Sequence, residues 1–109
     1  MSELDTRVLG VLRALTPGEV VSYGDVAEDA GFPGRARAVG RLLATTDVDV
    51  PWWRVVTSNG RLVPGHEAEQ ARRLRAEGVE VARYRVVLAR RGRFSRVDPL
   101  GCPQPPRSP

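Results

Sequence analysis

The residues of this chain that could do chemistry are two adjacent tryptophans, in the run Pro51-Trp52-Trp53-Arg54-Val55. An indole has no lone pair with the nucleophilicity of a thiolate, so neither ring is suited to covalent catalysis. A large, flat, apolar ring is suited to stacking, which is worth about 1–3 kcal/mol for each nucleobase. The alternative for either tryptophan is an ordinary place in the hydrophobic core. The pair therefore indicates binding or packing and argues against a nucleophile.

The other reactive side chains are single and isolated. His66 is the only histidine, and no neighbouring cysteine or paired carboxylate accompanies it, so we predict no metal site. Cys102 is the only cysteine, which excludes an intramolecular disulfide. It lies in a proline-rich tail, where we do not expect it to act as an acceptor thiol. No cofactor is predicted.

The charge of the chain favours an anionic partner. All 17 basic residues are arginines, and the formal net charge is +4 at pH 7. A guanidinium group forks onto phosphate and stacks on bases in ways that an ammonium group cannot. A basic composition alone is weak evidence for nucleic acid. The arginines between Arg90 and Arg96 allow two interpretations, a phosphate-contacting tail or a solubilising one.

The length of the chain, 109 residues, is enough for one small domain. We predict that residues 1–98 form this domain and that residues 99–109 are a disordered, proline-rich tail. No apolar run approaches the roughly 20 residues that cross a bilayer, and Met1 to Asp5 lack the apolar core of a signal peptide. We therefore expect a cytoplasmic protein without a membrane partner.

Four amphipathic stretches have the apolar spacing of helices. The predicted helices cover residues 3–15, 23–30, 35–45 and 67–77. Ser22 is a suitable N-cap for the second helix, with Asp25 three residues further on. The tight turn between the second and third helices fits a helix-turn-helix, whose second helix normally faces DNA. Spacing alone leaves open an ordinary helical hairpin with a solvated arginine face.

The remaining segments predict a small amount of β-structure. Residues 53–57 are β-like, and Ser58-Asn59-Gly60 is a turn signal after which residues 61–63 can pair back as a hairpin. Residues 79–88 alternate like one strand. The sequence therefore predicts an α/β fold that is mostly α-helical.

Three blocks in order resemble the O6-alkylguanine-DNA alkyltransferase family. They are Val21 to Ala27, Gly34 to Gly40 and Val50 to Val56, and Glu77-Gly78-Val79 is similar to the segment that closes the family's domain. In the family the third block carries Pro-Cys-His-Arg-Val, whose cysteine accepts an alkyl group from damaged guanine. Trp52 stands at the cysteine position and Trp53 at the histidine position. A tryptophan at the cysteine position is the mark of the alkyltransferase-like proteins, which bind alkylated bases without repairing them.

The resemblance implies a single small winged helix-turn-helix domain of the alkyltransferase C-terminal-domain type, which binds the minor groove. Arg37 matches the arginine that fills the gap left by an extruded base, and Tyr23 matches the tyrosine that crowds the phosphate 3′ of the target. The residues expected at the DNA are Ser22, Tyr23, Arg35, Ala36, Arg37 and Gly40. Those expected at a pocket for the alkylated base are Pro51, Trp52, Arg54 and Arg61. For Arg54 we favour structural support over direct contact, and Trp53 belongs either to the pocket or to the core.

The resemblance further implies a non-enzymatic sensor of DNA damage. Such a protein binds O6-alkylguanine in double-stranded DNA by nucleotide flipping and marks it for nucleotide excision repair, so repair proteins are expected partners. We expect a monomer, because no dimer-forming segment is evident. The alternative is a winged-helix transcription regulator without damage specificity, which would not need the Trp52 pocket. The segment between Gly60 and Glu67 is shorter than in the family, which makes a more open pocket a hypothesis.

Overall fold

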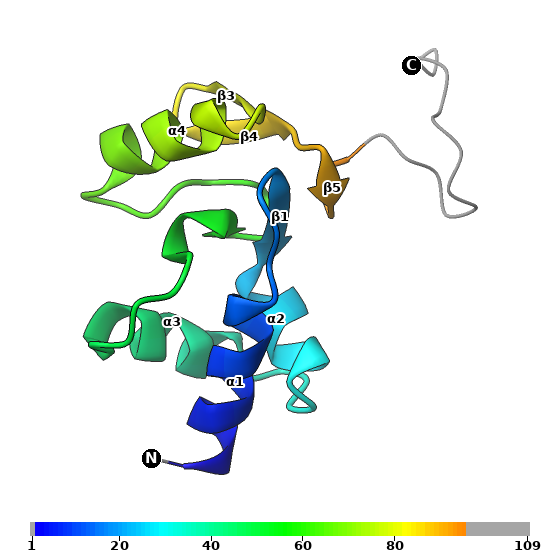
Figure 1. The fold of residues 1–109 in the computed structure, drawn as a ribbon, viewed down its shortest axis with the longest axis vertical. Coiled ribbons are helices and arrows are strands. Elements are labelled where there is room, and N and C mark those ends of the chain that lie inside the picture. The colour runs from blue at the N-terminus through cyan, green and yellow to red at the C-terminus, as the bar shows by residue number, and fades with distance from the viewer. Residues whose placement is uncertain (1, 96–109) are drawn as a thin grey trace.

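The computed structural model describes residues 2–95, which form four α-helices, one 3₁₀ turn and five short strands (Figure 1). In chain order these elements are α1 (Glu3–Arg13), β1 (Glu19–Ser22), α2 (Tyr23–Asp29), α3 (Ala36–Thr45), the 3₁₀ turn η1 (Trp52–Arg54), β2 (Val55–Val56), α4 (Glu67–Ala76), β3 (Glu80–Ala82), β4 (Arg85–Leu88) and β5 (Arg91–Gly92). This mixed, mostly helical architecture confirms the predicted fold class. Residue 1 and residues 96–109 lie outside the described residues, and so do the expectations for Arg96, Cys102, the tail and the domain limit at residue 98.

Local sequence signals account for the ends of the helices. The Ser2 Oγ accepts the Asp5 N–H at 3.1 Å and caps α1. Ser22 and Asp25 form a capping box at α2, in which each side chain accepts the backbone N–H of the other residue at 3.0 Å. After α4 the chain turns at Gly78, whose φ of 86° suits glycine. All four predicted helices are confirmed to within two residues at each end. None of the helices among the described residues is long and apolar enough to cross a membrane.

Helices α1, α2 and α3 pack around the first of two hydrophobic cores. The Phe32 N–H donates to the Ala27 carbonyl at 2.8 Å and tightens the turn between α2 and α3. The buried members of this core are Val8, Leu9, Leu12, Leu15, Val21, Val26, Ala27, Ala30, Val39, Val50 and Val55. On α3, Val39 is fully buried while Arg37 and Arg41 are exposed. The helix-turn-helix is therefore present, with its arginines directed outward.

Strand β1 is the centre of a three-stranded parallel sheet, with β2 on one side and β5 on the other. Because successive side chains of a strand point to opposite faces, Val21 and its partner Val55 enter the first core, whereas Val20 and Val56 enter a second one. The second core consists of Val20, Val56, Leu62, Ala71, Leu74, Val79, Val86 and Ala89. The ribbon of β1 and β2 therefore lies between two cores, the first beside α1 to α3 and the second beside α4 and the β3–β4 hairpin (Figure 1).

The prediction of a strand over residues 53–57 is wrong for residues 53 and 54. Residues 52–54 form the turn η1, in which the Trp52 N–H donates to the Val50 carbonyl at 2.7 Å and the Arg54 N–H donates to the Pro51 carbonyl at 3.1 Å. The aromatic side chains favoured a strand, but these turn hydrogen bonds curl the backbone before Val55. Only the two residues of β2 are extended.

The single strand predicted over residues 79–88 is also wrong, because these residues form the antiparallel hairpin β3–β4. Ala82 pairs with Arg85, and the two residues between them make the turn. Arg83 and Tyr84 have φ values of 52° and 63°, as a two-residue type I′ turn requires. The sequence hid this turn because neither residue is a glycine or an asparagine.

The hairpin predicted between residues 53–57 and 61–63 is reduced to contacts between Thr57 and Arg61. The Thr57 N–H donates to the Arg61 carbonyl at 3.2 Å, and the Arg61 N–H donates to the Thr57 Oγ1 at 2.9 Å. The segment pairs with the β3–β4 hairpin instead. Arg61 lies opposite Arg85 in an isolated antiparallel bridge, and the Leu62 N–H donates to the Tyr84 carbonyl at 2.9 Å. The chain between β2 and α4 is thereby attached to the hairpin.

Candidate functional site

A cavity of about 570 Å³ opens between α3 and the segment that leads into α4. Its lining consists of Tyr23, Gly40, Leu43, Ala44, Trp52, Val63, Pro64, His66 and Glu69. The volume falls within the roughly 300–1,000 Å³ of typical small-molecule pockets, so a planar ring such as a nucleobase can enter. Tyr23 and Gly40, which the sequence predicts at the DNA, thus lie around one cavity with Trp52, which it predicts at the base pocket.

The Trp52 ring forms an apolar part of the lining and is held by two aromatic neighbours. The Trp53 ring centroid lies 6.2 Å away with an interplanar angle of 89°, and that of His66 lies 5.9 Å away at 65°. Edge-to-face contacts of this kind are favourable and restrict the rotation of the ring. The arrangement gives the cavity a flat, apolar surface that the neighbouring rings hold in place.

Tyr23 begins α2 and contributes a half-buried phenol to the same cavity. Burial raises the pKa of the Tyr23 hydroxyl, which therefore stays protonated at neutral pH and can donate a hydrogen bond. A Cβ atom placed on Gly40 would lie 3.9 Å from this ring, an ordinary van der Waals distance. An alanine at this position would therefore meet the Tyr23 ring without a clash.

The other residues expected at the DNA lie around the starts of α2 and α3. Arg37 is exposed on α3 and Ala36 is half-buried beside it. Arg35 is exposed and precedes α3 without a side-chain cap, so the first amide groups of this helix are available to solvent or to an anion. Ser22 is buried, and its hydroxyl caps α2, which makes support of Tyr23 its structural role.

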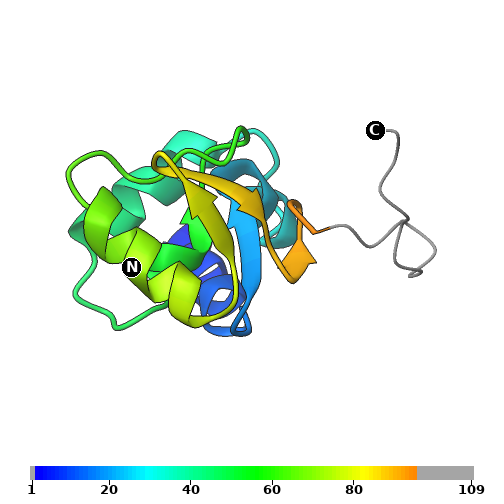
Figure 2. The ribbon, with the colours of Figure 1, turned by 90° about the horizontal axis from the view of Figure 1, so that it is seen from above.

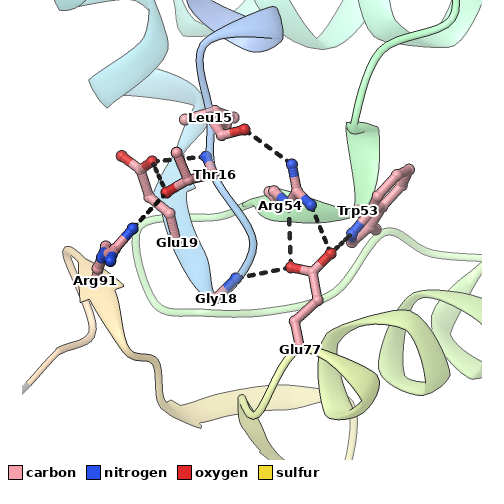
Figure 3. Close-up of polar contacts among 8 residues, drawn as sticks. All are labelled: Leu15, Thr16, Gly18, Glu19, Trp53, Arg54, Glu77 and Arg91. Atoms are coloured by element: carbon pink, nitrogen blue, oxygen red, sulfur yellow. Dashed lines mark hydrogen bonds and ion pairs between the residues drawn. The ribbon is translucent and has the colours of Figure 1, made fainter.

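A buried network links η1 to the end of α4 and to the turn after α1 (Figure 3). The Glu77 carboxylate accepts two hydrogen bonds from Arg54, from Nε at 3.0 Å and from Nη2 at 2.7 Å. It also accepts the Trp53 Nε1–H at 2.8 Å and the Gly18 N–H at 2.9 Å. Arg54 Nη1 donates to the Leu15 carbonyl at 2.9 Å, and so the guanidinium joins three separate segments.

The network settles the charge of Glu77. Burial alone would raise the pKa of Glu77, but hydrogen bonds from Arg54, Gly18 and Trp53 outweigh it and hold the pKa below its usual value. The Glu77 side chain is therefore a deprotonated carboxylate at neutral pH and accepts all of these hydrogen bonds. Both partners of the Arg54–Glu77 ion pair are nearly buried, with side chains 11% and 14% exposed. Removing one partner of such an ion pair destabilises the fold strongly, because the other charge stays buried without its counterion.

Three of the residues predicted to line the base pocket do not line this cavity. The guanidinium of Arg54 is bonded to Glu77 and Leu15, so its role in the structure is the support that we favoured. Pro51 precedes η1 outside the lining, and Arg61 is exposed beside the β3–β4 hairpin. Of the four predicted pocket residues, the structure brings only Trp52 into the cavity.

Trp53 lies on the side of the second core and does not line the cavity. Its ring is contacted by two guanidinium groups, with Arg73 Cζ 4.6 Å and Arg54 Cζ 5.1 Å from the ring centroid. Cation–π contacts of this kind contribute about 0.5–2 kcal/mol each. The core alternative therefore describes the position of Trp53, although it lies in a 3₁₀ turn and not in the strand expected there.

Sequence reasoning missed the wall of the cavity that α4 and its preceding segment supply. His66 and Glu69 are three residues apart at the start of α4, a spacing that places both on one face of a helix. This spacing was the available signal, but only the packing of α4 directs the face into the cavity. Glu69 also pairs with Arg73 at 2.9 Å. Within residues 2–95 no group of three potential metal ligands occurs.

The arginines after β4 make internal contacts. Arg93 forms a two-pronged ion pair with Asp25, at 2.6 and 2.9 Å. The hydrogen bond from Arg93 lowers the pKa of Asp25 against the opposing effect of burial. Arg91 Nη1 donates to the Thr16 Oγ1 at 3.1 Å. Arg93 therefore attaches the flank of β5 to α2, and Arg91 attaches β5 to the turn between α1 and β1.

The sequence of the chain matches a known domain over most of the described residues. Residues 3–79 match the family model described as 6-O-methylguanine DNA methyltransferase, DNA binding domain. The chain is 33% identical to the DNA base-flipping protein of Vibrio parahaemolyticus over 84% of this chain and 95% of that protein. It is 34% identical to alkyltransferase-like protein 1 of Schizosaccharomyces pombe over 74% of this chain and 81% of that protein.

The fold is similar to solved structures of the same kind. A crystal structure of S. pombe Atl1 in complex with damaged DNA containing O6-carboxymethylguanine matches with a TM-score of 0.67 and 34% identity, covering 75% of this chain and 82% of that one. A structure of S. pombe ATL in complex with DNA matches with a TM-score of 0.69 and 28% identity, covering 96% and 98%.

Proposed function

This chain belongs to the family of the 6-O-methylguanine DNA methyltransferase DNA-binding domain, as an alkyltransferase-like member, and from that premise we propose that it recognises damaged DNA without repairing it. The lesion is an O6-alkylguanine in a duplex, rotated out of the helix into the cavity beside Trp52. The observation that carries the proposal is that Trp52, at the position of the acceptor cysteine, lines a cavity of about 570 Å³ together with Tyr23.

When the base is extruded the duplex loses stacking and base pairing, and protein groups must replace these interactions. Unstacking and unpairing a nucleotide costs a few kcal/mol, and less when alkylation has already weakened the base pair. Arg37 is exposed on α3 and has the planar group needed to fill the gap in the stack. Tyr23 presents bulk and a hydroxyl donor at the start of α2, where the phosphate of the rotated nucleotide would pass. Stacking on Trp52 returns about 1–3 kcal/mol.

Alkyl transfer does not belong to this function. An indole carbon or nitrogen is too weak a nucleophile to displace an alkyl group from guanine at neutral pH. The residue that follows is Trp53, whose indole nitrogen is a donor only and has no basic lone pair with which to take a proton from a neighbour; its Nε1–H is donated to Glu77. The alkylated base would leave the pocket unchanged.

A protein that holds a lesion without removing it needs a downstream pathway. We assign this chain the role of marking the site for nucleotide excision repair, acting as a monomer in the cytoplasm and on the nucleoid. Support comes from the lack of any acceptor at Trp52 and from the similarity to alkyltransferase-like protein 1. Pull-down of excision-repair proteins on lesion-bearing DNA, with and without this chain, tests the assignment.

The primary test uses two short duplexes that differ only in one O6-methylguanine. We expect tighter binding to the modified duplex, accompanied by quenching of tryptophan fluorescence as the base stacks on Trp52. The mass of the protein should be unchanged after incubation. Arg37→Ala should weaken the preference, while Arg13→Ala, an exposed arginine at the end of α1, serves as the control. Equal binding to both duplexes would favour a general winged-helix regulator instead.

A further inference from the structure

The β3–β4 hairpin presents two exposed arginines and an exposed tyrosine, and a third exposed arginine lies beside it on the segment between β2 and α4. Arg83 and Tyr84 form its turn, Arg85 begins β4, and Arg61 pairs with it from the neighbouring segment. We call this set the arginine hairpin. It lies almost entirely beyond residue 79, where the match to the family's domain ends.

The turn of the arginine hairpin is made from residue types that disfavour its conformation. Both Arg83 and Tyr84 have positive φ values, 52° and 63°. Type I′ turns with this geometry strongly prefer Asn-Gly, because a Cβ atom is strained in the left-handed region. A turn that retains an arginine and a tyrosine at this cost is consistent with a function for the two side chains. Tyr84 is 55% exposed, so the second core does not explain its presence.

The pairing within the arginine hairpin places like charges together. Arg61 and Arg85 lie directly opposite each other in an antiparallel bridge, where two like charges are destabilising. The ion pairs of residues 2–95 neutralise Arg7, Arg54, Arg72, Arg73 and Arg93, and none of them involves the arginine hairpin. The surface is therefore suited to an external anion with several charges.

The arginine hairpin is attached to the rim of the cavity. The Tyr84 carbonyl accepts the Leu62 N–H at 2.9 Å, and the next residue, Val63, lines the cavity. Figure 2 shows the turn of the hairpin beside the segment between β2 and α4. A strand of DNA whose nucleotide occupies the cavity would continue past this rim on both sides of that nucleotide. Arginine side chains on the rim can therefore reach the phosphates that flank the lesion.

We infer that the arginine hairpin is a second DNA contact, which binds the sugar–phosphate backbone next to the nucleotide held in the cavity. The inference rests on the proposed function, because it places the lesion in the cavity. Arg61, Arg83 and Arg85 contact phosphates, and the Tyr84 ring packs on a sugar or an unstacked base. These contacts carry no sequence information, so they strengthen binding to damaged and undamaged DNA alike.

The test measures how affinity depends on salt in the double variant R61Q/R85Q. Each phosphate contact adds about 0.9 to the slope of log K against log salt, so this variant should show a slope less steep by about 2. The matched control is R7Q/R13Q, which removes two exposed arginines from α1 and gives the same net charge. The control should keep the wild-type slope. An equal change of slope in both variants would overturn the inference.

The two duplexes of the primary test separate this inference from the proposed function. If the wild-type chain shows no preference for O6-methylguanine, the proposed function fails. If the wild-type chain prefers the lesion and R61Q/R85Q keeps the full slope, only the second contact fails. We expect R61Q/R85Q to bind both duplexes more weakly than the wild type does. The ratio of the two affinities should be unchanged, because the phosphates are the same in both duplexes.

A second variant distinguishes binding from folding. R83N/Y84G replaces the turn with the preferred Asn-Gly pair, which should raise the midpoint of thermal unfolding by several degrees. The same variant should bind both duplexes several-fold more weakly. A raised midpoint with unchanged affinity would overturn the role of the turn, because a purely structural hairpin gains from the exchange.

Discussion

Replacing Glu77 with alanine is expected to lower the free energy of unfolding by about 3–5 kcal/mol, the usual cost of leaving a buried charge unpaired. The Arg54 guanidinium would keep only the Leu15 carbonyl, and the Trp53 and Gly18 N–H groups would lose their acceptor. A domain of this size has a total stability of about 5–15 kcal/mol, so the variant should lie close to unfolding.

Chemical denaturation followed by circular dichroism measures this effect. The matched control is Glu69→Ala, which removes an α4 carboxylate that is 45% exposed and paired with Arg73 at the surface. Such pairs contribute about 0–1 kcal/mol, so the control should stay near the wild-type midpoint. Equal losses in the two variants would show that the network is not the support that its geometry indicates.

The same carboxylate predicts a loss of stability in acid. The pKa of Glu77 is lowered in the folded chain, so its contribution is complete above the unfolded value of about 4.3 and is lost as the pH falls through the folded value. Asp25 contributes in the same direction, because Arg93 lowers its pKa. The free energy of unfolding, measured from pH 7 to pH 2, should therefore decrease once the pH is below about 4.5. The decrease should be less steep in Glu77→Gln than in the wild type. Identical slopes would contradict the prediction.

Replacing Trp52 with alanine is expected to reduce the preference for O6-methylguanine by about 5- to 150-fold, which corresponds to the loss of one base–aromatic stack. Affinity for the unmodified duplex should change little, because Arg37 and the phosphate contacts remain. The two affinities can be measured by fluorescence anisotropy of labelled duplexes at one stated salt concentration.

Trp52→Phe is the control for this prediction, since a smaller ring retains part of the stacking surface. It should lie between the wild type and Trp52→Ala in its preference. A loss that is the same for both duplexes would mean that Trp52 supports the fold and not the lesion, because η1 also carries Trp53 and Arg54.

The helices of this chain were predictable because their signals are local. Ser22 and Asp25 mark the start of α2 within four residues, and the spacing of apolar residues on α3 sets its buried side. The resemblance of the blocks around Trp52 also predicts a pocket at this residue, and Trp52 lines a cavity in the structure. Each of these inferences depends on residues that are near one another in the chain.

The remaining features depend on contacts that no local pattern contains. The turn at Arg83 and Tyr84 interrupts an alternation that runs on through it, so residues 79–88 read as one strand. The sequence favours a supporting role for Arg54, but it does not identify Glu77, 23 residues further on, as the partner. His66 lines the cavity only because of the way α4 packs, and the spacing of residues in the sequence does not predict that packing.

The two-faced ribbon of β1 and β2 limits how this domain can be divided. A fragment that ends after β2 would keep α1, α2, α3 and the first core, but it would expose Val20 and Val56 to water. The same cut would remove Glu77 and leave the Arg54 guanidinium without its carboxylate partner. Helices α1, α2 and α3 are therefore not a detachable module. They can be transplanted, shortened or recombined only together with the half of the chain that closes their strand.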